Sequence, residues 1–263
     1  MKVRAPATTA NLGPGFDCAA AALDLWNEVE VGEGGDPSDP AHIGVRAFGL
    51  VASPEGLAFK WASPIPRARG LGSSAATIAL GLVAAARWSN QELSLEELLA
   101  RGAPLEGHSD NLAACLAGGV CLTWDGRIER LADTLPLTPV VVIPAEKVTT
   151  AESRLALPDE VPHRDAAYTV ARAALLGAGV ARGDVALLSA AFSDRVHEPY
   201  RPSRILDDVR ATPPAGAAGA TLSGSGPTVI VWAEDADTCA AELAERFPDE
   251  EVLTLPVVAD GAH

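Results

Sequence analysis

The segment from 66 to 75, Pro-Arg-Ala-Arg-Gly-Leu-Gly-Ser-Ser-Ala, constrains this chain more than any other. Its glycines let the backbone approach a ligand closely, and the small residues that follow it predict a helix over 73–88. The first N–H groups of a helix have no partner within it, and the helix dipole places positive charge at the same end. The loop therefore predicts a site for an anion with several oxygens, and a polyphosphate has that shape.

Three other interpretations of the loop explain less of it. A Walker A loop requires a lysine directly after its last glycine, whereas the dinucleotide fingerprint G-x-G-x-x-[GA] requires an apolar strand directly before it. The chain has three lysines, none at that place: Lys2, Lys60 and Lys147. Arg67 and Arg69 stand where the apolar strand would be. A plain turn whose serines cap the helix explains one serine and the glycines, but not the basic approach that Pro66 begins.

Two further blocks accompany the loop, PATTANLGPGFD at 6–17 and GATLSGSGPT at 219–228. Together the three blocks resemble the conserved segments of the GHMP small-molecule kinases, in the same order. Three shorter segments are similar to the homoserine kinases of that superfamily: LEGHSDNLA at 105–113, KVTTAESR at 147–154 and HEPYR at 197–201. The resemblance runs from about residue 2 to residue 233, and it implies ATP-dependent phosphorylation of the side-chain hydroxyl of L-homoserine, a step of threonine biosynthesis.

The resemblance also implies the fold, a two-domain α+β GHMP kinase. An N-terminal α+β domain, 1–135, would carry the phosphate loop. A C-terminal ferredoxin-like α/β sandwich, 136–263, would carry the substrate arginines and a glycine-rich closing loop at 224–228. The sequence agrees, because strands and helices alternate without the regular period of a barrel, and 263 residues with 48% hydrophobic content can bury one large or two smaller cores.

Local patterns predict the elements. Alternation and apolar runs bounded by turn residues predict strands at 3–5, 26–31, 56–61, 120–124, 127–131, 140–143, 228–233 and 251–257. Helical periodicity and cap residues predict helices at 73–88, from 94 with a Ser94–Glu97 capping box, from 109 or 110 to the glycines at 118–119, and at 163–177, 183–191, 203–210 and 235–246.

For the nucleotide, the resemblance implies ATP bound by the whole loop: Pro66, Arg67, Ala68, Arg69, Gly70, Leu71, Gly72, Ser73, Ser74, Ala75 and Ala76. It implies that Ser74 and Glu106 hold Mg²⁺. One hydroxyl and one carboxylate suffice, because magnesium prefers hard oxygen ligands and keeps much of its water. Without the resemblance, Ser74 reads as a helix cap and Glu106 as a solvated surface acid.

Homoserine is a zwitterion, so its pocket needs an anion for the ammonium group and a cationic fork for the carboxylate. The resemblance places Asp17 near the ammonium group, and Arg154 and Arg201 near the carboxylate. It implies that Asn111 orients the hydroxyl under attack. Further polar contacts are expected from Asn11, His108, Asp110 and Thr150. The general base stays open; Asp17 is a weak candidate, because pairing with an ammonium group keeps a carboxylate a poor base.

Several alternatives stay open. The alternation of Glu106, His108 and Asp110 resembles a transition-metal cluster, although such metals usually take two or three histidines. The chain could phosphorylate another small alcohol, or it could be a relative of these kinases that binds a small molecule without catalysing a reaction. Two departures from the family pattern bear on this. The short 42–56 segment has no asparagine for the adenine base, and the direct Glu106–His108 junction could pull Glu106 away from Ser74.

Charge and targeting signals predict the partners. The formal net charge of −15 argues against nucleic acid and against anionic membranes, whose binding requires a basic surface. The partners expected are a small-molecule substrate and, as an open possibility, a second copy in a homodimer. The four cysteines form no C-x-x-C pair, which argues against a zinc ribbon. The N-terminus lacks the apolar region of a signal peptide, so a cytoplasmic location is expected.

Overall fold

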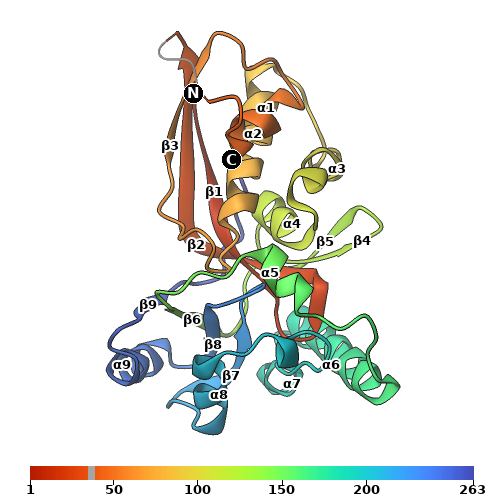
Figure 1. Cartoon of the computed structure of the whole chain (residues 1–263), viewed down its shortest axis with the longest axis vertical. Helices are drawn as coiled ribbons and strands as arrows, with labels where there is room; N and C mark the ends of the chain where they lie inside the picture. Colours follow the sequence, from red (N-terminus) through yellow and green to blue (C-terminus); the bar gives the residue numbers. More distant parts are fainter. Residues whose placement is uncertain (35–38) are drawn as a thin grey trace.

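The computed structural model describes residues 1–34 and 39–263, with the backbone alone at Thr150 and Ala151. Its described part has two antiparallel sheets, one in each half of an elongated molecule (Figure 1). The first sheet has the order β1-β2-β4-β5, with β3 paired to the far half of β2: β1 Lys2–Asn11, β2 Gly15–Glu33, β3 Leu57–Ala62, β4 Val120–Trp124 and β5 Arg127–Ala132. The second has the order β7-β8-β6-β9: β6 Thr138–Ile143, β7 Ala217–Leu222, β8 Val229–Ala233 and β9 Glu251–Thr254.

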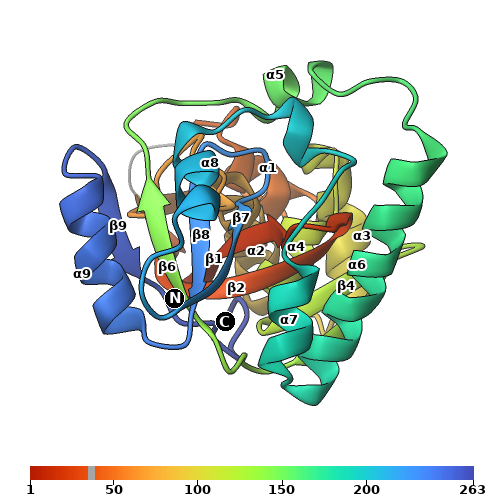
Figure 2. The ribbon, with the colours of Figure 1, turned by 90° about the horizontal axis from the view of Figure 1, so that it is seen from below.

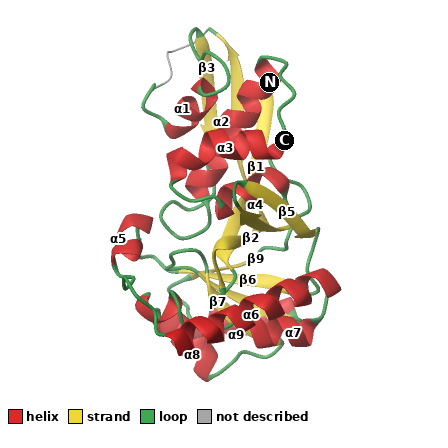
Figure 3. Cartoon of the chain, turned by 90° about the vertical axis from the view of Figure 1, so that its right-hand side faces the viewer, coloured by secondary structure: helices red, strands yellow, loops and turns green. Residues whose placement is uncertain are grey.

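Four helices pack beside the long strands of the first sheet: α1 Ile43–Gly49, α2 Ser73–Trp88, α3 Leu95–Glu106 and α4 Asp110–Ala117 (Figure 3). α2 is buried from Ala75 to Ala86, which explains why its sequence is apolar and small on every side. Gly81 lets it approach α1, because a Cβ there would lie 2.2 Å from the carbonyl oxygen of Gly44. The position of the phosphate loop at its start is thus set by the core.

The helices of the second half are α5 Thr150–Leu155, α6 His163–Arg182, α7 Val185–Ala191, α8 Arg204–Ala211 and α9 Ala236–Arg246, with a 3-10 turn at Glu198–Tyr200 (Figure 2). One face of the second sheet is covered by α8 and α9, and the other face packs in one cluster with α6, α7 and the first domain. Val140 and Val142 of β6 pack in a cluster with α8 and α9. Val141 and Ile143, on the other face of that strand, join the core of the first half. One continuous core therefore fixes the two halves against each other.

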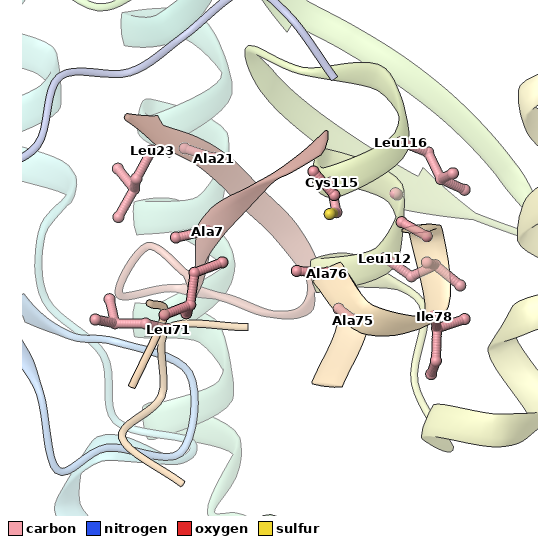
Figure 4. Packing of buried hydrophobic residues seen from close by; sticks show 14 of the residues in the cluster. Ala7, Ala21, Leu23, Leu71, Ala75, Ala76, Ile78, Leu112, Cys115 and Leu116 are labelled. Carbon is pink, nitrogen blue, oxygen red and sulfur yellow. The ribbon is translucent and has the colours of Figure 1, made fainter. Parts of the chain in front are cut away.

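Figure 4 shows how this core holds the start of α2. Ala75 and Ala76 lie opposite Leu112 and Cys115 of α4, and Leu71 reaches toward the strands that carry Ala7 and Leu23. The Leu71 side chain is buried, although it belongs to the loop. The hydrophobic effect therefore fastens the middle of the loop while the glycines on either side of it remain free to face a ligand.

The segment after β9 returns to the first sheet. Val257 bridges Leu23, and Ala262 and His263 hydrogen-bond the backbone of Cys115 and Arg4. The two-domain α+β prediction is confirmed. We propose domains of 1–135 and 136–263 from the division between the sheets, with the last residues packed on the N-terminal domain. Among the helices described, none has the length and apolar composition that a membrane crossing requires.

Candidate active site

A cavity of about 270 Å³ lies where the two domains meet. Its lining comes from β1 and β2, the phosphate loop, the α3–α4 junction, α5 and the two turns that face them from the second domain. The lining residues are Asn11, Asp17, Pro66, 68–74, Glu106, His108, Asp110, Asn111, Val148, Thr149, Arg154, Arg201, Gly224 and Ser225. The structure thus gathers segments that are far apart in the sequence.

Most of the predicted site residues lie in this lining. Arg67, Ala75 and Ala76 do not: Arg67 is exposed on the surface, and the two alanines are buried in the core. The N–H of Ala76 donates to the carbonyl oxygen of Gly72 at 2.9 Å, so that it is already used within the helix. The predicted contact at Thr150 lies outside the described side chains.

The phosphate loop is held by its carbonyl groups. The carbonyl oxygens of Arg69, Gly70 and Leu71 accept hydrogen bonds from Thr228 N, Ser223 Oγ and Thr8 N, at 3.3, 2.7 and 3.2 Å. Gly70 and Gly72 have positive φ, and a Cβ would lie 2.2 Å from Ser223 O at the first and 1.9 Å from Thr8 Oγ1 at the second. Only glycine fits at both positions.

The first turn of α2 is open toward the cavity. Its N-cap is Gly72 in the left-handed conformation, and among the described residues no side chain caps its N–H groups. α3 and α5 both have complete capping boxes, whereas α4 also has no side-chain cap at its N-cap Ser109. The alternative in which the loop serines merely cap the helix is therefore wrong, and the free N–H groups and the helix dipole favour an anion at this part of the cavity.

Ser74 and Glu106 meet at the edge of the loop. Burial raises the pKa of the Glu106 carboxyl group above its ordinary value. The charge of the nearby His108 and a side-chain hydrogen bond with Ser74 both act to lower that pKa, but burial outweighs them. The other carboxylate oxygen, Oε2, is buried without a hydrogen-bond partner. The short junction after Glu106 therefore leaves it beside Ser74, and the pair offers a hard cation one hydroxyl and one unused carboxylate oxygen.

His108 is bound to Asp110 rather than arranged as a metal ligand. Its Nδ1 lies 2.7 Å from Asp110 Oδ1, and its Nε2 lies 3.8 Å from Glu106 Oε1. Burial alone would lower the pKa of His108, but the hydrogen bond and charge of Asp110 outweigh it and raise that pKa. Within the described part of the chain, no group of three or more His, Cys, Asp or Glu side chains is arranged around a metal position. The transition-metal alternative thus gains no support from this geometry.

The cavity lining also carries paired charges. Arg154 of α5 donates two hydrogen bonds to Asp17, Nη2 to Oδ1 at 2.7 Å and Nη1 to Oδ2 at 3.0 Å. Asp17 has a φ of 57°, so its side chain is delivered by an uncommon backbone conformation. Each side chain is 38% exposed, which leaves both accessible to a ligand in the cavity.

Arg201 is the second cation of the lining. Its Nη1 donates to His197 Nδ1 at 3.0 Å and to the carbonyl oxygen of Gly224 at 3.2 Å. Its Nε is buried and has no partner in the portion of the chain described. The Nε edge of the guanidinium is therefore the part left for a bound anion, and an arginine edge matches a carboxylate.

His197, which the sequence prediction missed, holds Arg201 from behind. It is fully buried, its Nε2 lies 2.7 Å from the carbonyl oxygen of Gly13, and the Phe16 ring stacks on it at 5.1 Å. A carbonyl only accepts and a guanidinium only donates, so the proton lies on Nε2 and the ring is neutral. Burial lowers the pKa of His197, in agreement with a neutral ring. The sequence signal for this contact was the four-residue spacing between His197 and Arg201.

Asn11 lies in the lining but is already bonded at both ends of its amide. Its Oδ1 accepts from Asp17 N at 3.0 Å, and its Nδ2 donates to the carbonyl oxygen of Gly224 at 2.9 Å. It therefore joins β1 to the closing loop and orients Asp17. Val148 and Thr149 line the cavity without having been predicted. The Thr149–Glu152 capping box was their signal, since it places Thr149 at the start of α5.

Comparison with known proteins agrees with this geometry. Residues 41–119 match the family model of the GHMP kinases N terminal domain, and residues 178–249 match that of the GHMP kinases C terminal. The homoserine kinase of Prochlorococcus marinus (strain MIT 9215) is 37% identical over 267 residues, which cover 89% of this chain and 84% of that protein. That of Streptomyces coelicolor is 41% identical over 266 residues, covering 90% and 85%.

A solved structure has the same architecture over the whole chain. The crystal structure of homoserine kinase from Cytophaga hutchinsonii matches with a TM-score of 0.88 at 26% sequence identity, covering 100% of this chain and 96% of that one. Fold, cavity and sequence similarity lead to one assignment. The chain belongs to the homoserine kinases, within the GHMP kinase family of two-domain α+β enzymes.

Proposed function

We propose that this enzyme transfers the γ-phosphoryl group of ATP to the side-chain hydroxyl of L-homoserine and releases O-phospho-L-homoserine and ADP. The observation that carries the proposal is that one cavity is lined both by the uncapped start of a helix and by a carboxylate with two guanidinium groups. A kinase for a zwitterionic alcohol needs both sets of groups in one site. The names of the relatives support the same substrate.

For the nucleotide, the backbone of 70–74 would hold the phosphates. The loop carbonyl groups already accept hydrogen bonds from Thr8, Ser223 and Thr228, which support the loop without a ligand. Arg69 lies in the lining, and its buried Nη1 has no partner within the described residues. Phosphoryl transfer depends mostly on positioning and charge neutralisation, so a preformed set of donors is the main requirement.

Ser74 and Glu106 would hold Mg²⁺. The fit rests on the unpartnered Oε2 of Glu106, a buried oxygen next to a hydroxyl. When bound, the ion would neutralise charge on the phosphates. Burial disfavours the charged form of Glu106, and a nearby cation would favour it again.

For the acceptor, Asp17 would bind the ammonium group of homoserine and the free Nε edge of Arg201 its carboxylate, with Arg154 as the second cation. His108 and Asp110 would line the path between the nucleotide and the acceptor. This division assigns each charge of the substrate an opposite charge in the cavity. Uncharged sugars would leave these groups unpaired, which disfavours them as substrates.

In the transfer step, the alcohol oxygen forms the new bond to the γ-phosphorus while the bond from that phosphorus to the bridging oxygen breaks. The electrons of the broken bond leave with ADP, and the hydroxyl proton passes to a phosphoryl oxygen or to solvent. Asn111 would orient the reacting hydroxyl. Asp17 is a poor proton acceptor because it is engaged with Arg154, or with an ammonium group once substrate is bound.

The decisive experiment measures ATP consumption by the purified enzyme with L-homoserine, mevalonate or galactose as acceptor. Turnover with homoserine alone supports the proposal. Turnover with mevalonate or galactose instead would show that the enzyme phosphorylates that alcohol. Homoserine binding without turnover would favour a silent binding protein. The expectations that accompany the activity are proposals too: threonine biosynthesis as the pathway, the cytoplasm as the compartment and a homodimer as the assembly.

A further inference from the structure

Thr8 lies directly behind the cavity, in the middle of β1. Its side chain is fully buried and does not reach the lining. Its Oγ1 donates to the Oδ1 of Asn111 at 2.6 Å, across 103 residues of sequence. Asn111 stands in the first turn of α4 and does line the cavity. A buried hydroxyl is therefore bonded to the one amide of the lining that is proposed to act on the reacting hydroxyl.

This bond fixes which end of the Asn111 amide faces the ligand. A carboxamide has an acceptor at its oxygen and two donors at its nitrogen. Because Oδ1 is turned back to Thr8, the NH₂ group is the end directed into the cavity. Asn111 can then donate to an oxygen of the acceptor or of the phosphoryl group, and it cannot take the proton of the hydroxyl.

Thr8 is also bonded to the phosphate loop. Its N–H donates to the carbonyl oxygen of Leu71 at 3.2 Å. A Cβ on Gly72 would lie 1.9 Å from Thr8 Oγ1 and 3.2 Å from Asn111 Oδ1, so the loop glycine packs on this pair of side chains. One buried residue thus sets the distance between the loop and the amide.

We propose that Thr8 is a positioning residue that holds the Asn111 amide with its NH₂ group toward the phosphoryl-transfer centre. Its effect on the reaction passes entirely through Asn111. The inference rests on the proposed function, because it takes Asn111 as a residue that contacts the reacting groups. It goes further in naming the residue that orients Asn111 and in making Asn111 a donor.

The experiment is a double-mutant cycle with a matched control. Thr8→Ser and Thr8→Ala both remove the methyl group, and only the second removes the hydroxyl. Asn111→Ala removes the amide, and Thr8→Ala is then added to it. Steady-state kcat and KM for ATP and for homoserine are measured for all four variants and the wild type, together with melting temperatures.

We expect Thr8→Ala to lower kcat about tenfold with both KM values changed less than about threefold, and Thr8→Ser to stay within about threefold of wild type. Asn111→Ala should lower kcat about a hundredfold, the order of loss when one oriented donor is removed. In the Asn111→Ala background, Thr8→Ala should have no further effect on kcat. The proposal would be overturned if the kcat losses of Thr8→Ala and Asn111→Ala multiplied in the double variant. It would also be overturned if Thr8→Ser lowered kcat as much as Thr8→Ala.

The wild-type assay separates this proposal from the function itself. If homoserine is not turned over, the proposed function fails, and the cycle is read from melting temperatures alone. The hydrogen bond between Thr8 and Asn111 then predicts that the melting temperature of the double variant falls clearly less than the sum of the falls in the two single variants. Additive losses would show that Thr8 and Asn111 are not coupled, whatever the substrate is.

Discussion

Arg154 and Asp17 are joined by two parallel hydrogen bonds, at 2.7 and 3.0 Å, in the lining of the cavity. These are the groups proposed to meet opposite ends of the substrate zwitterion. Each side chain is 38% exposed, so the pair contributes no more than about 1 kcal/mol to stability. A zwitterion can therefore separate the two groups at little cost and give each a new partner of opposite charge.

Arg154→Ala should raise the KM for homoserine about tenfold to a hundredfold and leave the KM for ATP near its wild-type value. A charge-assisted hydrogen bond to a carboxylate contributes about 1.5–3 kcal/mol, and this one is made to the acceptor alone. Arg127→Ala is the matched control, because it removes an exposed arginine of β5 that does not line the cavity. Equal increases in both KM values would count against the assignment.

Acceptors that lack one pole of the zwitterion should be poor substrates. 4-Hydroxybutyrate has no ammonium group for Asp17, and 3-aminopropanol has no carboxylate for Arg154 and Arg201. We expect kcat/KM for each to fall at least about a hundredfold below that of homoserine, because a charged group of the site stays unpaired. Competition assays against homoserine measure this directly. An analogue used as well as homoserine would show that its missing pole is not recognised.

His197 should make the protein less stable at mildly acidic pH. Burial lowers its pKa in the folded state, so below about pH 6.5 the unfolded chain takes up a proton that the folded protein does not. Stability then rises with pH up to that value, and it falls by at most about 1.4 kcal/mol per unit as the pH drops below it. Denaturant unfolding at pH 7.5 and pH 5.5 measures the difference.

His197→Gln should lose this part of the pH dependence, since glutamine does not titrate but can still donate to Gly13. His163→Gln serves as the control, because His163 is exposed at the start of α6. If the His197 variant kept the full wild-type slope and the His163 variant lost it, the buried neutral histidine would not be its source.

Two glycine substitutions should change the unfolding free energy in opposite directions. Gly72→Ala would place a Cβ 1.9 Å from Thr8 Oγ1 at a φ of 66°, so we expect a loss of about 2 kcal/mol or more in unfolding free energy, together with weaker ATP binding. Gly177→Ala meets nothing within 4 Å in the middle of α6 and should stabilise by about 0.5–1 kcal/mol. Chemical denaturation and nucleotide titration test both. A Gly72→Ala protein of normal stability and affinity would refute the tight packing of the loop.

The sequence predicted the helices and strands that are determined by patterns of neighbouring residues. α2 has the predicted bounds, and α3 begins at the predicted Ser94–Glu97 capping box. β7 was not predicted, because Ala217–Leu222 is rich in alanine and glycine and becomes a strand only by pairing with β8. α6 runs past the predicted residue 177 to Arg182, since Gly177 and Gly179 resemble helix ends, while the left-handed cap is Gly183.

The same division applies to the site. The loop, the acids and the arginines lie in segments whose residue types suggest their chemistry, and the structure brings most of them into one lining. Thr8 and His197 could not be found this way. Their importance comes from hydrogen bonds to Asn111 and to Gly13, which are 103 and 184 residues away, and nothing in the neighbouring sequence of either residue indicates these partners.

The most direct measurement is a crystal structure with a nonhydrolysable ATP analogue, Mg²⁺ and homoserine bound together. We expect the triphosphate on the N–H groups of 70–74, the ion between Ser74 and Glu106, and the amino acid between Asp17 and the Nε edge of Arg201, with the Arg154–Asp17 pair separated. Phosphates bound away from this loop, or homoserine bound outside the cavity with the pair intact, would contradict the shared site on which the kinase mechanism depends.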